Sequence, residues 1–344
     1  MGRLKRVDCS EPGIQRRRRG RGFEFLLPDG SRLDDEDTLA RIRELAIPPA
    51  WKDVWICMHP RGHLQATGVD AAGRKQYLYH ADWRIRRDQQ KFDQMLEFAE
   101  SLPELRRVVR RDLAADGLGR DRVLAAAVRL LDRGLFRIGS EDYADQNESF
   151  GLATLRKDHV TLNGTRMSFN FPAKSGRQRD QTLEEPAVMP VVRALKRRRG
   201  GSPELLAFQA ARRWVDVTSA DINGYLKAVT GDDFTAKDFR TWNGTVIAAA
   251  ALAGEVPATK TARKRRVNDA VKGVSMFLGN TPAVSRASYI DPRVLDRFQS
   301  GWTIAVELQP GEDPFAKERK RRRIEQAVID LISEPRESPL VERP

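Results

Sequence analysis

The periodicity of the apolar residues changes near residues 83–90, and this change constrains the fold more than any other feature of the chain. Upstream, apolar and polar residues alternate in short runs that glycine and proline interrupt, which is typical of β-strands. Downstream, Phe92, Met95, Leu96 and Ala99 fall on one stripe at helical spacing, which is typical of a helix with one buried face. We therefore expect an α+β protein with a small, mainly β domain followed by a larger, mainly α domain.

The N-terminal part contains a basic run and several strand-like segments. We divide the chain into a basic arm (1–22), an N-terminal β domain (23–86) and a helical C-terminal domain (87–344). The arm, with the run EPGIQRRRRGRG, is either a solvated, mobile tail or a segment that grips phosphates. Alternation of Phe23, Phe25 and Leu27 before a Pro-Asp-Gly turn predicts a hairpin. A short helix is expected at 35–45 and three short strands at 54–80.

The C-terminal part reads as helices with one β excursion. Alternation on both sides of an Asn163-Gly164 turn predicts a hairpin within 159–176. Helices are predicted at 121–139, 184–199, 202–214, 219–231, 235–254, 281–289 and 313–335. Thr235 with Asp238 forms a capping box, which places Lys237 and Arg240 in the first turns of its helix.

Charge and missing motifs narrow the function. The net charge of +13 and the pI near 10 favour a polyanionic partner. Nucleic acid is preferred to a membrane because no apolar run approaches the ~20 residues of a membrane-spanning helix. The N-terminus lacks an apolar signal segment, so a cytoplasmic protein is expected. A phosphate-binding loop of the GxxxxGK[ST] type and a GxSxG nucleophile elbow are both missing.

Cysteine and histidine are too sparse to indicate a metal or disulfide framework. Cys9 and Cys57 are the only cysteines, which excludes a disulfide scaffold. Cys57, His59 and His63 could be imagined as metal ligands, but they lie on an expected hairpin and its turn. Structural zinc usually takes four ligands. We therefore expect no metal site.

Phosphodiester chemistry without a metal needs a particular set of side chains. Arginine and lysine must supply the positive charge that stabilises the non-bridging oxygens. A tyrosine phenol can attack phosphorus when guanidinium groups stabilise its phenolate, and a lysine can protonate the leaving oxygen. Tyr289 lies in the last turn of the short helix predicted at 281–289. Alone, this position is more typical of a packing residue.

Four segments that occur in a particular order favour a catalytic role for Tyr289. They are LFRIGSEDYADQNESFGLATLRKDHV (135–160), FNFPAKSG (169–176), KDFRTWNGT (237–245) and FLGNTPAVSRASY (277–289). Together they resemble type IB DNA topoisomerases of the small poxvirus and bacterial kind. Residues 47–80 resemble the β domain of the same family, and the resemblance covers roughly residues 40–300. It implies a tyrosine recombinase-like helical domain and a C-shaped clamp around duplex DNA.

The resemblance assigns five catalytic residues. Tyr289 matches the nucleophile that joins a DNA 3′ phosphate, and Arg137 and Arg240 match the two arginines that clamp the non-bridging oxygens. Lys174 matches the lysine that protonates the leaving 5′ oxygen. Asn280 stands where poxvirus and eukaryotic members have histidine, as in the bacterial branch. Its amide can donate a hydrogen bond to a phosphate oxygen but cannot shuttle a proton.

DNA contacts are expected at further positions. RKQYLYH resembles the strand that touches DNA in the poxvirus enzyme, which suggests Gln76, Tyr77 and Tyr79. The two tyrosines share one face of a strand, so a place in the core is the alternative. Tyr143 matches another contact residue of the family, and Lys237 precedes the second arginine by three residues.

The implied activity is relaxation of supercoiled DNA by cleavage, swivelling and religation of one strand, without ATP or a cofactor. We expect a monomer that acts on double-stranded DNA in the cytoplasm, in association with the nucleoid. A tyrosine recombinase is the nearest rival, but that family has histidine where this chain has Lys237, and it usually lacks a preceding β domain. A non-enzymatic basic DNA-binding protein would explain the charge alone.

Overall fold

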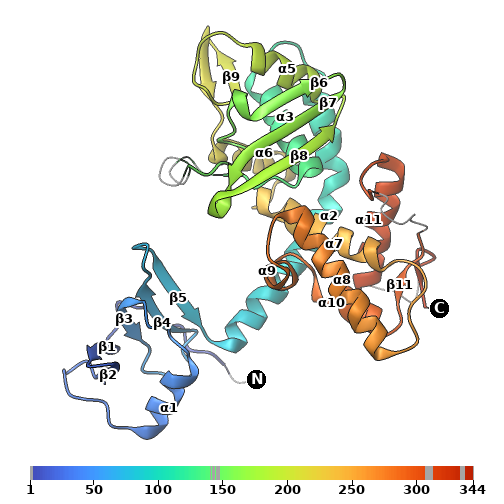
Figure 1. Cartoon of the computed structure of the whole chain (residues 1–344). Helices are drawn as coiled ribbons and strands as arrows, with labels where there is room; N and C mark the ends of the chain where they lie inside the picture. Colours follow the sequence, from blue (N-terminus) through green and yellow to red (C-terminus); the bar gives the residue numbers. More distant parts are fainter. Residues whose placement is uncertain are drawn as a thin grey trace. The chain divides into compact units, whose positions relative to one another are not determined.

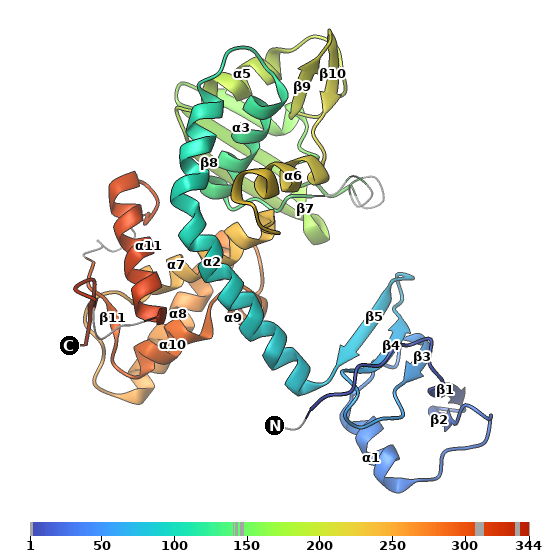
Figure 2. The same ribbon diagram turned by 180° about the vertical axis from the view of Figure 1, so that it is seen from behind.

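The structure is a computed structural model that divides into two compact units. It describes residues 3–139, 141, 144, 148–306, 313–333 and 338–343. The units are Met1–Asp93 and Gln94–Pro344, and Figures 1 and 2 show them from opposite sides. The first is built on a β-sheet and the second mainly on helices, which confirms the expected α+β class. Among the described residues, no helix is long and apolar enough to span a membrane.

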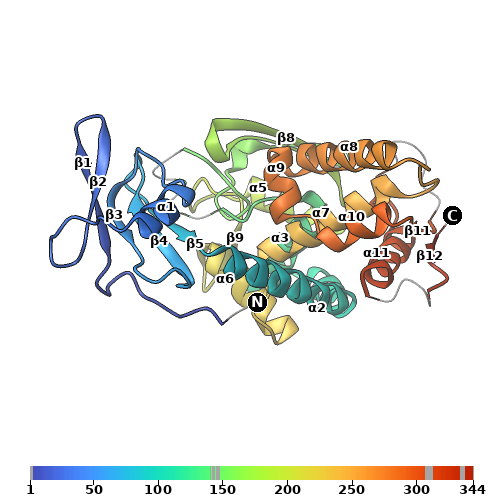
Figure 3. The ribbon, with the colours of Figure 1, turned by 90° about the horizontal axis from the view of Figure 1, so that it is seen from below.

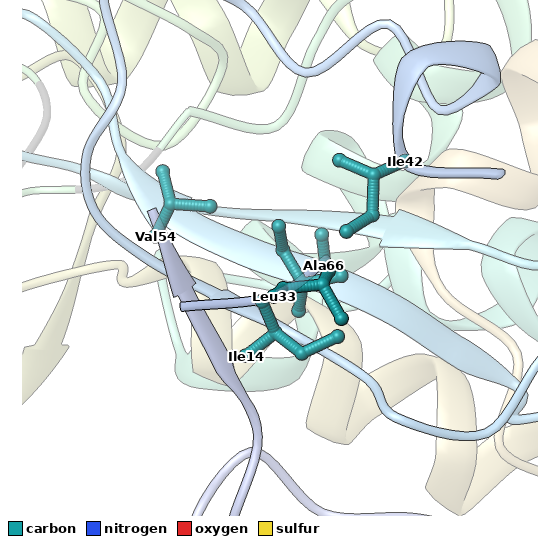
Figure 4. Close-up of a cluster of buried hydrophobic side chains, with 6 residues drawn as sticks. Ile14, Leu33, Ile42, Val54 and Ala66 are labelled. Carbon is teal, nitrogen blue, oxygen red and sulfur yellow. The ribbon is translucent and has the colours of Figure 1, made fainter. Parts of the chain in front are cut away.

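The first unit contains a five-stranded antiparallel sheet in the order β2-β1-β3-β4-β5. Its strands are β1 (Ile14–Arg19), β2 (Gly22–Leu26), β3 (Lys52–Ile56), β4 (Leu64–Val69) and β5 (Lys75–Tyr79). Helix α1 (Glu36–Glu44) begins after Asp35, whose carboxylate accepts a hydrogen bond from the backbone N–H of Thr38 at 2.8 Å. The core between sheet and helix, shown in Figure 4, contains Ile14, Leu33, Ile42, Val54, Ile56 and Ala66.

The basic run does not form an arm ahead of the β domain, so that prediction is corrected for residues 14–19. They form strand β1, which pairs with both β2 and β3. Ile14 is buried in the core, and the guanidinium of Arg16 donates to the backbone carbonyl oxygens of Pro48 and Trp51. The Pro-Asp-Gly turn closes only a single bridge between Leu26 and Arg32, so β1 is the partner of the predicted strand.

Helix α2 (Ala81–Leu113) begins in the first unit and continues into the second. Of the predicted stripe, Phe92, Met95 and Ala99 are buried and Leu96 is half-buried, and Phe98 belongs to the same face. This burial follows from the three-to-four-residue spacing, which puts these side chains on one side of the helix.

The second unit combines helices with a three-stranded antiparallel sheet, β6-β7-β8. Its helices are α3 (Arg120–Gly134), α5 (Met189–Arg197), α6 (Ser219–Thr230), α7 (Ala236–Leu252), α8 (Lys260–Leu278), α9 (Pro282–Ser288), α10 (Pro292–Gln299) and α11 (Glu318–Ser333). Its strands are β6 (Val160–Asn163), β7 (Arg166–Ala173), β8 (Arg177–Glu184), β9 (Ala207–Ala210), β10 (Arg213–Asp216), β11 (Thr303–Ile304) and β12 (Val341–Glu342). Strand β8 was not predicted, because its sequence RQRDQTLE contains only one apolar residue.

Helix α7 lies in the middle of the second unit and packs against α3, α8, α10 and α11 (Figure 3). Most of its side chains are buried, including Phe239, Trp242 and Val246. The capping box predicted at Thr235 and Asp238 is present. A helix that is buried on most of its surface is a rigid support for residues that project from its first turns.

The helix predicted at 202–214 is wrong, because this segment contains the β9–β10 hairpin. Arg213 pairs with Ala210, so Ala211 and Arg212 form the turn, and both have positive φ angles of 42° and 70°. Such two-residue turns usually contain asparagine or glycine, which mark them in a sequence. Alanine and arginine carry no such signal, and the apolar spacing around them resembled that of a helix.

The helix predicted at 121–139 ends earlier, at Gly134. Leu135 adopts a left-handed conformation with φ of 53° and terminates α3. The following residues are extended: the carbonyl oxygens of Arg137 and Ile138 accept hydrogen bonds from the N–H groups of Leu152 and Ala153. Arg137 therefore lies in an extended segment that leaves the end of a buried helix.

A buried ion network joins α2, α3 and α11. Arg106 donates to both Asp132 and Glu325, and Arg321 donates to the same two carboxylates. All four residues are less than a tenth exposed. Burial alone would raise the pKa of the Asp132 carboxyl, but the charges of Arg106 and Arg321 lower it below its ordinary value. Each charge in this network has a partner of opposite sign.

Candidate active site

The candidate site is built around the C-terminal end of helix α8. Gly279 closes the helix with φ of 62°, a conformation that glycine adopts readily. The N–H of Asn280 then donates to the carbonyl oxygen of Ser275 at 3.0 Å. This closure leaves the last carbonyl oxygens of the helix to be satisfied from outside.

Three arginines from three different elements bind three consecutive carbonyl oxygens at this helix end. Arg179 of β8 donates to Phe277 at 2.8 Å. Arg240 of α7 donates to Leu278 at 2.8 Å, and Arg137 donates to Gly279 at 3.1 Å. The negative end of the helix dipole favours cations here. A cavity of about 20 Å³ is lined by all three arginine side chains.

Arg240 is held rigidly. It is 4% exposed, and its guanidinium donates to the carbonyl oxygens of Leu135 and Leu278. Burial and, after it, the positive charge of Arg137 lower the pKa of Arg240 to about 10, while Tyr289 opposes the shift. Its Nε is buried and has no hydrogen-bond partner among the described residues.

Arg137 is positioned by a close crossing of two loops. A Cβ atom on Gly151 would lie 2.8 Å from the carbonyl oxygen of Arg137 and 2.4 Å from the Cα of Gly139, so only glycine fits at residue 151. The guanidinium of Arg137 donates to the side-chain oxygen of Asn280 at 2.5 Å. This hydrogen bond sets the orientation of the Asn280 amide.

Asn280 has an unsatisfied donor. With its oxygen bound to Arg137, its Nδ2 atom is buried and has no hydrogen-bond partner in the part of the chain that the structure describes. Buried amide groups are normally hydrogen-bonded, since an unpaired one costs about 1–3 kcal/mol. A phosphate oxygen is a suitable acceptor for this N–H.

Tyr289 follows directly after α9 and is anchored to α7. A Cβ atom on Gly244 would lie 2.5 Å from the Tyr289 carbonyl oxygen, so the small residue permits this close approach. The N–H of Asp291, two residues further on, donates to Thr245 Oγ1 at 3.0 Å. The ring of Tyr289 is half-buried, and the guanidinium carbon of Arg240 lies 5.3 Å from the ring centroid. The phenol and this arginine are therefore neighbours.

Two lysines assigned by the resemblance are exposed. Lys174 lies at the turn between β7 and β8. Lys237 is exposed in the first turn of α7, three residues before Arg240. Both ammonium groups are accessible to a large ligand.

Among the described residues, the charges of Arg179 and Arg240 are not neutralised by carboxylates as the charges of Arg106 and Arg321 are. Within the described ranges, no aspartate or glutamate forms an ion pair with Arg179 or Arg240. Arg179 is bound by the Phe277 carbonyl oxygen and by Gln181, and Arg240 is bound by backbone carbonyl oxygens. These partners carry no formal charge, so the guanidinium groups keep their positive charge. Arginine forks with a neighbouring amide donor and phenol can bind a phosphate and stabilise charge that develops on its oxygens.

The candidate DNA contacts of the first unit lie on β5. Tyr77 and Tyr79 are 45% and 38% exposed, so the alternative of a place in the core is wrong. Their rings stack with centroids 6.2 Å apart. Gln76 points to the opposite face of the strand and donates to Asp70 at 2.8 Å. Tyr143 lies outside the described residues.

The three residues considered as metal ligands have other partners. Cys57 Sγ lies 3.4 Å from the N–H of His59, and His63 Nδ1 accepts from the N–H of Val7. Lys5 Nζ lies 2.6 Å from His59 Nε2. Throughout the described part of the chain, no three histidine, cysteine, aspartate or glutamate side chains gather in a group that could hold a metal ion.

Sequence reasoning missed Arg179. Its guanidinium lies against Gly279, where a Cβ atom would be 3.1 Å from Nη1. Burial lowers its pKa, and the charge of Arg137 contributes. In the sequence, only its position five residues after Lys174, across a turn, could have indicated that Arg179 belongs to the site. That inference would have required the prediction of strand β8.

Comparisons with known proteins show which family the chain belongs to. Residues 80–303 match the family model of the catalytic core of eukaryotic DNA topoisomerase I, and residues 22–70 match that of the N-terminal domain of bacterial DNA topoisomerase IB. The chain is 29% identical to DNA topoisomerase 1B of Acanthamoeba polyphaga mimivirus over 312 residues, which cover 88% of this chain and 92% of the viral protein. It is 26% identical to DNA topoisomerase 1 of Schizosaccharomyces pombe over 167 residues, 48% of this chain and 19% of the yeast protein.

An arginine cluster beside a tyrosine contains the chemical groups that phosphodiester chemistry without a metal needs. The chain belongs to the type IB DNA topoisomerases. Its substrate is DNA, whose topology it changes.

Proposed function

We propose that the enzyme relaxes supercoiled duplex DNA through a covalent 3′-phosphotyrosyl intermediate. The Tyr289 oxygen attacks a backbone phosphorus, a new P–O bond forms, and the bond to the 5′ oxygen breaks. Torsion in the DNA turns the released 5′ end, and its hydroxyl then attacks the phosphotyrosine to restore the strand. Because the phosphotyrosine conserves the energy of the diester, neither ATP nor an obligatory metal takes part.

Each side chain of the site has a role in this proposal. Arg137 and Arg240 bind the non-bridging oxygens as negative charge develops, and Asn280 Nδ2 donates to one of them. Lys174 protonates the leaving 5′ oxygen and takes the proton back during religation. Lys237 binds the DNA backbone.

The observation that supports this proposal most is the charge of Arg240, which is held in place and pairs with no carboxylate of the described residues. Arg240 and Arg137 are fixed by consecutive carbonyl oxygens of one helix end, and Arg240 lies 5.3 Å from the ring of Tyr289. A preorganised cationic site does not need to reorganise when charge develops, and removing one such donor typically costs about 10²–10³ in rate.

Substrate binding extends beyond the cluster in our proposal. The first unit contacts DNA through Gln76, Tyr77 and Tyr79, and the second unit through Tyr143 and the catalytic residues. The exposure of the two stacked tyrosines supports this assignment. Both domains hold the same duplex, and a monomer acts at the nucleoid.

The proposal is tested by relaxation of supercoiled plasmid in EDTA without ATP, with wild type and Tyr289→Phe. Wild type is expected to relax supercoils of both signs and to form an adduct on the DNA 3′ end when the reaction is quenched with detergent. Tyr289→Phe is expected to bind DNA with unchanged affinity and to give no adduct. An adduct on the 5′ end, or relaxation by the variant, would contradict the proposal.

A tyrosine recombinase is the second candidate, because it uses the same nucleophile and arginine pair. Lys237 at the position of the recombinase histidine argues against it. Products of strand exchange between two duplexes in the same assay would favour this candidate.

A further inference from the structure

We propose that Arg179 is a positioning residue that holds the hairpin bearing Lys174 against the end of helix α8. This inference rests on the proposed function, since it assigns Lys174 as the proton donor to the 5′ oxygen. It adds a third arginine to the site, with a task that differs from those of Arg137 and Arg240.

Arg179 connects the β-sheet to the helix end through several hydrogen bonds. It lies on β8 opposite Phe171 of β7, and Ala173 pairs with Arg177 beside the turn that carries Lys174. Its Nη2 donates to the Phe277 carbonyl oxygen at 2.8 Å, while Nε and Nη2 donate to Gln181 Oε1 at 3.3 and 3.0 Å. The hydrogen bond to Phe277 therefore links the β7–β8 hairpin, which carries Lys174, to helix α8, which precedes Asn280.

Gln181 extends this connection to the third element of the site. It lies two residues after Arg179 and so on the same face of β8. Its amide accepts from Arg179 and donates to the carbonyl oxygen of Gly134, at the end of α3. Arg137 follows Gly134 by three residues, so one chain of hydrogen bonds links the ends of α3 and α8 through the lysine hairpin.

The position of Lys174 depends on this connection because the lysine has few other restraints. Its side chain is exposed in a three-residue turn. A long side chain at a hairpin tip reaches a reacting atom only if the hairpin itself is held, since misplacement by about 1 Å can cost 10²-fold in rate. Strand β8 contacts α8 at the guanidinium of Arg179, five residues from the lysine.

A direct catalytic role is less favoured for Arg179 than a positioning role. Its Nε and Nη2 are engaged by Gln181 and Phe277, and its Nη1 lies against Gly279. By contrast, Arg240 keeps a buried donor without a partner among the described residues. The donors of Arg179 are thus directed at the protein.

The test uses a leaving group that does not need the lysine. A duplex with a 5′-bridging sulfur at the cleavage site releases a thiolate, which departs without a proton from a general acid because its conjugate acid is stronger than an alcohol. Single-turnover cleavage of this duplex and of its oxygen counterpart is measured with the full chain as wild type, Lys174→Ala, Arg179→Ala and Arg179→Lys. Arg166→Ala is the matched control, an arginine on the same sheet in an exposed pair with Glu184.

We expect Lys174→Ala to slow cleavage of the oxygen duplex about 100-fold and Arg179→Ala about tenfold, with both restored to within about threefold of wild type by sulfur. Arg166→Ala should match wild type on both duplexes. If Arg179→Ala stays slow on the sulfur duplex, or matches wild type on the oxygen duplex, the inference is wrong.

Two further controls keep the result interpretable. If Arg179→Ala does not fold, as judged by its circular dichroism, Gln181→Ala removes the bridge to Gly134 while keeping Arg179, and the same rescue by sulfur is expected. If wild type fails to cleave either duplex, or Lys174→Ala is not restored by sulfur, the proposed function fails, independently of Arg179.

Discussion

Two groups of arginines in the second unit differ in the partners that hold them. Arg106 and Arg321 are bound by the carboxylates of Asp132 and Glu325 in the interior. Arg240 and Arg179 are bound by backbone carbonyls at the end of α8, and no carboxylate among the described residues pairs with them. Both groups are ordered, but only the first has its charge neutralised.

This difference separates arginines whose charge is neutralised from arginines whose charge is not. A carboxylate partner compensates a buried guanidinium, so the pair can hold helices together but has little attraction left for an anion. A carbonyl partner supplies only a partial charge, so the guanidinium is oriented while its full charge remains available to a phosphate. Asp132 lies in α3, five residues before Arg137, which follows the end of that helix. The ion network of Arg106, Arg321, Asp132 and Glu325 therefore supports the helix that precedes Arg137.

The largest effect is expected from Asp132→Asn. It removes a charge that faces both Arg106 and Arg321, and breaking a buried pair in this way typically costs about 3–5 kcal/mol of unfolding free energy. Denaturant unfolding followed by circular dichroism measures the loss, with the exposed Arg166→Ala as control. An active site that fails while stability is unchanged would contradict the structural role.

Arg240→Ala tests the opposite side of the comparison. The rate of covalent adduct formation should fall by about 10²–10³, as for loss of one preorganised donor in a transition state. Stability should fall less than in Asp132→Asn, because the substitution also removes an uncompensated buried charge. Single-turnover cleavage and denaturant unfolding of the same preparation measure the rate and the stability. A loss of stability as large as that of Asp132→Asn would contradict the difference between the two groups of arginines.

Asn280→Ala should have a smaller effect. Loss of one hydrogen bond to a charged group is expected to slow cleavage by roughly 10- to 100-fold, in line with about 1.5–3 kcal/mol. DNA affinity should be unchanged if the amide acts mainly in the transition state. Equal losses in affinity and rate, measured by binding titration and single-turnover cleavage, would show that it acts in the ground state.

Lowering the pH is expected to weaken gradually the stabilisation that comes from the buried ion network around Asp132. The pKa of Asp132 is lower in the folded chain than its ordinary value, so the network's contribution to stability is complete above about pH 4. It decreases as the pH falls further, by at most about 1.4 kcal/mol per pH unit for one proton. Unfolding of wild type and Asp132→Asn between pH 2 and 5 should therefore converge, and parallel curves would contradict this linkage.

Much of the fold could be predicted from the sequence because the relevant signals are local. The stripe through Phe92, Met95 and Ala99 and the capping box at Thr235 act within one helix. The Asn163-Gly164 turn and the short helix before Tyr289 were found for the same reason. The β9–β10 hairpin was missed because its turn residues, Ala211 and Arg212, adopt positive φ angles, which alanine and arginine do not favour.

By itself, the sequence determined the two-part α+β organisation and the order of the segments that carry Tyr289, Arg137, Arg240, Lys174 and Asn280. Only the tertiary structure decided how these side chains are held, because the carbonyls that bind the arginines are contributed by a helix far away in the chain. Arg179 belongs to this second class. Hydrogen bonds between distant backbone groups and side chains depend on packing, which no local pattern of residue types records.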